Sequence, residues 1–113
     1  MNSTIKKFAL IITTSFLLSG CLIQDPKPED CVTKEITVTA IEEGTSFDIV
    51  IKEKKDDFYY INRGLEQGLT IEGLKEQIMN KKVNLQLYKF WFGTSEHISQ
   101  LTVDNNVLFT EFD

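Results

Sequence analysis

The chain opens with a short apolar segment that ends at a cysteine, and this segment limits how much of the chain is left to fold. Lys6 and Lys7 make the first residues basic, and an apolar run extends from Phe8 to Leu18. This is the pattern of a secretory signal, which is cut off during export. The run is too short, and too often interrupted by Thr and Ser, to span the roughly 30 Å of hydrocarbon in a bilayer. Removal of residues 1–20 would leave fewer than 100 residues to build a core.

The end of the apolar run has a specific form, in which Leu18, Ser19 and Gly20 stand directly before Cys21. This stretch resembles the lipobox of bacterial lipoproteins, where an aliphatic residue, a small residue and Gly or Ala precede a cysteine. The resemblance implies that the Cys21 thiol receives a diacylglyceryl group and that the new amine can be acylated too. Several acyl chains hold a protein on a membrane far more firmly than one chain does. The alternative is that Cys21 is an ordinary residue near a signal cleavage site.

The residue after the cysteine bears on which membrane would hold the protein. In enterobacteria-like cells, Asp at this position retains a lipoprotein in the inner membrane, whereas this chain has Leu22. The resemblance therefore implies a lipid anchor on the extracytoplasmic side of the cell membrane. It favours the periplasmic face of the outer membrane if the cell has two membranes.

The net charge of the chain is informative when it is counted without the signal segment, residues 1–20. Loss of Lys6 and Lys7 reduces the 12 basic residues to 10 against 17 acidic ones, a formal charge of −7. Such a surface repels phosphate groups, so nucleic acid is not expected as a partner. Basic proteins or cationic ligands are favoured electrostatically, although acidity can also serve solubility alone.

The remaining chain divides into a tether over residues 21–31 and one small domain over residues 32–113. Pro26, Pro28 and their charged neighbours predict an extended tether. Cys31 would be the only thiol left after lipidation of Cys21, either free or in an intermolecular disulfide.

Apolar residues alternate with others through most of the domain, which indicates half-buried strands. We expect strands over 36–41, 47–52, 58–61, 83–92, 97–103 and 107–112. Between Leu87 and Tyr88 the apolar set changes parity, which predicts a bulge or a bend. Thr70 can cap a helix over 71–80, in which Leu74 and Ile78 belong to the inward stripe.

This order of elements predicts an α+β domain that is mainly β. The expected architecture is a small five- to six-stranded antiparallel barrel with one helix after the third strand, similar to oligonucleotide/oligosaccharide-binding (OB) barrels. A β sandwich or an open sheet with one packed helix is the alternative. The segment from Phe58 to Leu87 also resembles small lipoproteins of the bacterial cell envelope, which implies no activity.

The sequence contains no recognisable catalytic, cofactor or metal signature. The only histidine, His97, lies between Ser95 and Ser99 on an expected strand, and we interpret it as structural because a hydrolase would also need an orienting acid and an oxyanion hole. The acidic pairs Glu42-Glu43 and Asp56-Asp57 lack the spacing of a calcium loop.

Aromatic residues supply the candidate binding positions, which are Trp91 and Tyr59. If 83–92 is one strand, Trp91 points away from Phe90 and Phe92, so we expect those two phenylalanines to be mostly buried and Trp91 to be partly accessible. The alternative is a strand buried on both faces. Accessible aromatic side chains contribute strongly to binding.

Together these features predict a membrane-anchored envelope lipoprotein with a non-enzymatic binding or structural role and no cofactor. Its partner would be a protein or a cell-wall component. An inhibitor or immunity-type protein against a basic envelope hydrolase is one alternative, and a small envelope enzyme is another.

Overall fold

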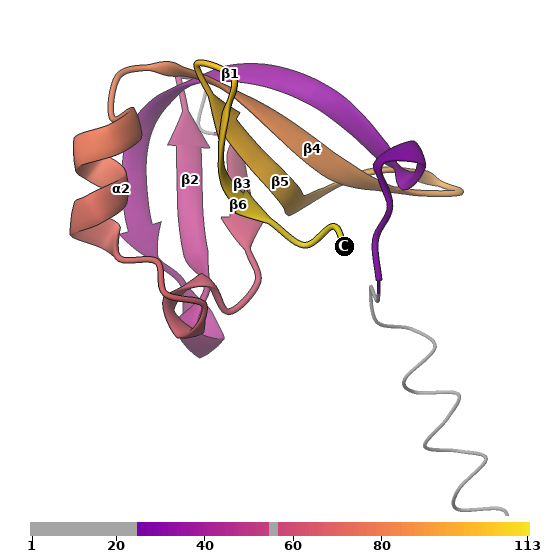
Figure 1. The fold of residues 1–113 in the computed structure, drawn as a ribbon, viewed down its shortest axis with the longest axis horizontal. Coiled ribbons are helices and arrows are strands. Elements are labelled where there is room, and N and C mark those ends of the chain that lie inside the picture. The colour runs from indigo at the N-terminus through magenta and orange to yellow at the C-terminus, as the bar shows by residue number, and fades with distance from the viewer. Residues whose placement is uncertain (1–24, 55–56) are drawn as a thin grey trace, which may run out of the picture.

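The computed structural model describes residues 25–54 and 57–113, so the signal segment and Cys21 lie outside the described residues (Figure 1). The described chain is mainly β. Its strands and its α-helix are β1 (Cys31–Glu43), β2 (Ile49–Glu53), β3 (Phe58–Ile61), α2 (Ile71–Ile78), β4 (Lys82–Phe90), β5 (Gly93–Val103) and β6 (Asn106–Thr110). Single 3-10 turns lie at η1 (Pro28–Asp30), η2 (Thr45–Phe47) and η3 (Gly64–Glu66).

Five strands, β1 to β5, form a closed ring, in which β1 is long enough to pair with a different neighbour along each half. The first half of β1 pairs with β4, from Cys31 opposite Tyr88 onward, and the second half pairs with β2. β2 also pairs with β3, and β4 with β5. The ring closes where Tyr60 of β3 lies beside His97 of β5, and β6 pairs with β5 outside the ring. The expected barrel is therefore confirmed, and neither a sandwich nor an open sheet is formed.

The barrel is mixed, so the expectation of a purely antiparallel barrel was wrong. β1 is antiparallel to both β2 and β4. β3 and β5, each antiparallel to one of those two strands, must then run in the same direction as β1. Their contact at the closing seam is consequently parallel.

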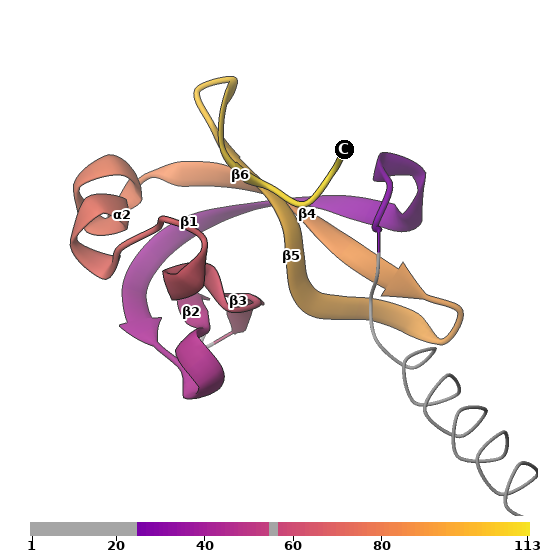
Figure 2. The ribbon, with the colours of Figure 1, turned by 60° about the horizontal axis from the view of Figure 1, so that its bottom comes forward.

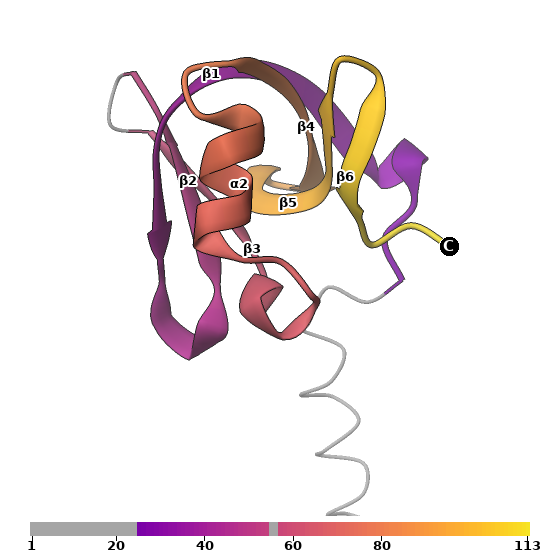
Figure 3. The same cartoon turned by 60° about the vertical axis from the view of Figure 1, so that its left-hand side comes forward.

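One hydrophobic core fills the ring and continues under α2, which lies across one end of the barrel (Figure 3). The helix begins as expected, because the Thr70 side chain accepts a hydrogen bond of 3.0 Å from the Gly73 N–H. Leu74 and Ile78 are buried against the barrel, which confirms the inward stripe. The helix ends two residues earlier than expected, since Asn80 adopts a left-handed conformation with φ of 63°.

The β4–β5 hairpin confirms one prediction and corrects another. The pairing of β4 with β5 shifts register on both sides of Leu87, which confirms the predicted bulge. However, β4 ends at Phe90, the chain turns at Trp91 and Phe92, and Gly93 already begins β5. Gly93 has φ of 148°, a conformation that favours glycine. The expected strand over 83–92 was therefore two residues too long.

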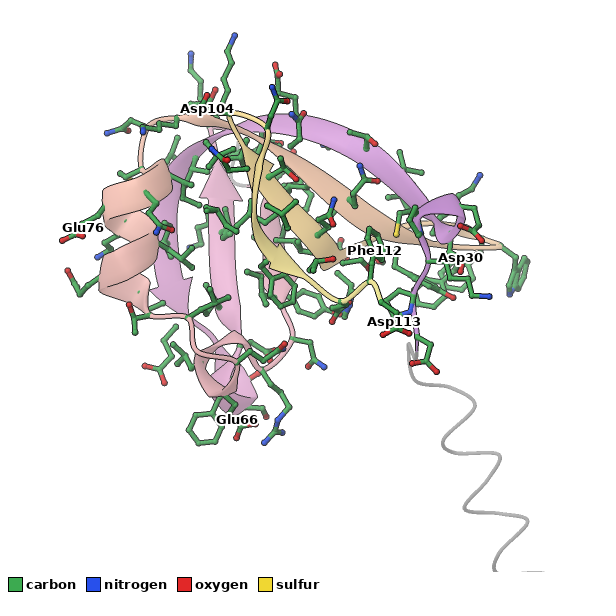
Figure 4. The ribbon with its side chains drawn as sticks, in the orientation of Figure 1. Asp30, Glu66, Glu76, Asp104, Phe112 and Asp113 are labelled. Atoms are coloured by element: carbon green, nitrogen blue, oxygen red, sulfur yellow. The ribbon has the colours of Figure 1, made fainter. Side chains whose placement is uncertain are left out.

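The two ends of the described chain meet on one side of the domain. Pro26 is buried, and η1 leads directly into Cys31, the first residue of β1. Residues 25–29 and the C-terminal Phe112 and Asp113 line one shallow pocket. Figure 4 shows Asp30, Phe112 and Asp113 at this end. Within the expected tether over residues 21–31, Pro26 is thus buried and Cys31 belongs to β1, whereas residues 27–30 are exposed.

Candidate functional site

An open cleft of about 470 Å³ lies where three strands of the barrel diverge. β3 pairs with β5 only at Tyr60, so the beginnings of these two strands separate. Within the described residues, the first half of β1 pairs with β4 alone, which leaves its other edge facing the same space. The cleft is lined by Val32, Thr33, Lys34, Asp57, Phe58, Tyr59, Leu87, Thr94, Ser95 and Glu96.

Tyr59 forms a fixed wall of this cleft. Its side chain is only 5% exposed, and its hydroxyl donates a hydrogen bond of 3.2 Å to Glu53 Oε1. Burial raises the pKa of Tyr59, so the phenol is neutral at physiological pH. Lys34 Nζ lies 5.3 Å from the centre of the Tyr59 ring and 3.7 Å from Glu53 Oε1. Its interaction with the Tyr59 side chain raises the pKa of Lys34, which keeps the ammonium charged.

The rim of the cleft combines apolar and charged side chains. Val32 and Phe58 are exposed, although both are large apolar residues on strands. Asp57 and Glu96 are exposed beside them and carry negative charge. A surface of this kind can bury apolar groups of a ligand and form ion pairs around them, as protein-binding sites do.

Trp91 lies outside the cleft, so the two aromatic candidates do not form one site. Trp91 is 94% exposed and Phe92 is 70% exposed. The expectation that Phe92 is mostly buried was therefore wrong, because the turn places it beyond the end of β4. Phe90, which is partly buried, stacks on Phe92 with ring centres 5.1 Å apart, and Trp91 contacts Phe92 edge to face at 5.4 Å. We call Phe90, Trp91 and Phe92 the aromatic tip.

His97 is buried at the closing seam of the barrel. Its Nε2 lies 2.6 Å from Glu111 Oε1, and its ring meets the edge of Tyr60 with ring centres 5.5 Å apart. Ser95 does not face the imidazole, since its hydroxyl donates to the Tyr88 carbonyl and accepts the backbone N–H of His97. These contacts link β3, β5 and the segment after β6 at the seam.

Two kinds of feature are missing from residues 25–54 and 57–113. No group of three or more His, Cys, Asp and Glu side chains in these ranges could hold a metal ion. No helix in them is long and apolar enough to cross a membrane.

Sequence reasoning singled out Tyr59, which lines the cleft but is buried, and did not single out the other cleft residues, above all Val32, Lys34 and Phe58. The pairing ranges of β1 and β3 create the cleft, and these ranges depend on strands distant in the sequence. Among the cleft residues that were missed, only Phe58 could have been recognised from its local sequence, because it follows a charged turn and precedes the inward-facing Tyr59.

Neither protein-family models, curated proteins nor solved structures give any match to this chain.

Proposed function

We propose that this chain is a lipid-anchored protein of the cell envelope that binds a protein or a cell-wall component without catalysing a reaction. The anchor would be the lipid on Cys21, on the extracytoplasmic side of the membrane. The observation that carries the binding role is the open cleft beside Tyr59, whose apolar rim remains exposed at Val32 and Phe58. Apolar side chains that rim a preformed cleft are a common feature of binding sites.

We further propose that the barrel is OB-like. In support of this, α2 lies between β3 and β4 in the chain, and β1 is shared between β2 and β4. The ring contains five strands, the number found in that fold. This likeness is one of architecture, and function does not follow from it.

A basic partner fits the charge of the cleft best. Asp57 and Glu96 are exposed at the rim, whereas the positive charge of Lys34 is already opposed by Glu53. A basic envelope hydrolase inhibited by this domain is therefore the second candidate function. Complementary charge of this kind accelerates association and selects partners more than it adds affinity.

The binding role can be tested with two phenylalanines that have the same exposure. Phe58, at the cleft, and Phe47, in the β1–β2 connection, are each 51% exposed. Phe58→Ala should reduce the recovery of envelope proteins or wall fragments on the immobilised protein, because it removes apolar contact area from the rim. Phe47→Ala should leave recovery unchanged. Equal recovery by both variants would contradict binding at the cleft, and a basic hydrolase lost only with Phe58→Ala would favour inhibition.

The anchor can be tested independently at Cys21. Cys21→Ser removes the only atom that can accept the diacylglyceryl group, so the variant should be unprocessed or should appear in the soluble fraction. Membrane fractionation and intact-mass measurement provide the readout. A Cys21→Ser protein that is still processed, and still needs detergent for extraction, would contradict lipidation.

A further inference from the structure

The aromatic tip has no role in the cleft or in the core. Trp91 is almost fully exposed, and Phe92 covers only part of its ring by stacking on Phe90. Tyr88 extends the same series, since its ring meets Phe90 edge to face at 5.0 Å. The hairpin therefore ends in a protruding group of aromatic side chains, with Lys89 exposed beside them. Aromatic rings at the end of a protruding hairpin can be removed from water only by contact with another surface.

The tip lies at the same end of the domain as the start of the described chain. Cys31, which follows η1, is the register partner of Tyr88, three residues before Trp91. Figures 1 and 2 both show η1 and the end of the β4–β5 hairpin at this end of the molecule. A surface that held the chain just before residue 25 would therefore lie close to the aromatic tip.

The distance from Cys21 to the folded domain is short. Pro26 is already buried against the domain, and only five peptide units separate it from Cys21. An extended chain covers at most about 3.6 Å per residue, so Cys21 lies within about 18 Å of Pro26. The proposed lipid on Cys21 would thus hold this end of the domain near the headgroups.

We propose that the aromatic tip inserts into the headgroup region of the bilayer that holds the lipid on Cys21. This inference rests on the proposed anchor. Trp is suited to that region because its ring is apolar and its indole N–H can remain hydrated. The tip and the anchor then attach the domain at two points and set its orientation on the membrane.

The charge of this end selects the kind of lipid. Glu29, Asp30 and Asp113 are exposed near the start of the described chain and outnumber the exposed Lys27 and Lys89, so this end is repelled by anionic headgroups. Zwitterionic phosphatidylcholine is therefore the appropriate test surface. Insertion of the rings depends on apolar contact and does not need anionic lipid.

Trp91 is the only tryptophan in the chain, so its fluorescence reports on the tip directly. The lipidated protein, from Cys21 to Asp113, would be reconstituted into phosphatidylcholine vesicles, with and without lipids brominated on the acyl chains close to the headgroups. We expect emission at a shorter wavelength than for tryptophan in water, quenching by iodide reduced several-fold relative to an exposed residue, and strong quenching by the brominated lipids.

A control tryptophan can be placed on the far part of the barrel. The variant Trp91→Phe/Val107→Trp moves the fluorophore to β6, where Val107 is exposed near the end of β5 opposite the tip. Its emission should stay water-like, accessible to iodide and insensitive to brominated lipids.

The outcomes separate this inference from the proposed function. If the protein floats with the vesicles and carries lipid on Cys21 but Trp91 remains water-exposed, the inference is wrong and the anchor stands. Protection from iodide without quenching by brominated lipid would place the tip against protein and would also overturn it. Failure to float, with no lipid on Cys21, would overturn both proposals.

Discussion

At the scale of single residues, the reactivity of Cys31 should reflect its burial. Burial raises the pKa of the Cys31 thiol, and the negative charges of Asp30 and Glu111 act in the same direction. A raised pKa means less thiolate at any given pH, and the thiolate is the reactive form. The rate of alkylation by iodoacetamide in the native protein should therefore reach half of its plateau at a higher pH than in urea. Mass spectrometry of the peptide containing Cys31 would provide the rates.

The readout for Cys31 is the midpoint of the pH dependence, because steric shielding lowers the rate equally at every pH. Identical midpoints in the native and the unfolded protein would contradict the effect of burial.

Residues whose environment is set by near neighbours were predictable, and the others were not. The cap at Thr70 and the burial of Leu74 follow from spacing within one helix, and both are confirmed. The exposure of Phe92 depends on where the chain turns, and alternation of apolar residues does not specify the last residue of a strand. Trp91 is accessible, as expected, but it lies in a turn and not on the face of a strand.

At the scale of elements, α2 should contribute to stability through its inward side chains. Leu74 is 1% exposed, so Leu74→Ala should lower the free energy of unfolding by about 2–5 kcal/mol through lost burial and a cavity. Gln77→Ala, on the exposed face of the same helix, should change it by less than about 0.5 kcal/mol. Urea unfolding of both variants provides the comparison, and equal losses would contradict the orientation of the helix.

Most elements were predictable from hydrophobic period, whereas the closure of the barrel was not. The change of parity at Leu87 predicted an irregularity in β4, and the register shifts there confirm it. The parallel contact of β3 with β5 joins Tyr60 to His97, and α2 and β4 separate these two residues in the sequence. Such a non-local pairing leaves no pattern in either strand. The cleft depends on the same pairing, which explains why most of its residues were missed.

At the scale of the whole molecule, the barrel should open first at its closing seam. β1 and β4 pair through seven residue pairs, whereas β3 and β5 pair through Tyr60 and His97 alone. Local opening requires less free energy where fewer backbone contacts must break. Hydrogen exchange in the native protein should therefore be faster for amides near Tyr60 than for those in the middle of the β1–β4 ladder. Uniform exchange across both regions would show that the ring opens only on global unfolding.

The meeting of the two chain ends at one side of the barrel has a practical consequence for attaching other proteins to the domain. A reporter fused after Asp113 would emerge beside Pro26, on the side of the domain that faces the proposed anchor. A reporter inserted between Asp104 and Asn105, in the β5–β6 turn, would be carried at a distance from Asp113 (Figure 4). The same barrel would thus present cargo either close to the proposed anchor or away from it, depending on the site of insertion.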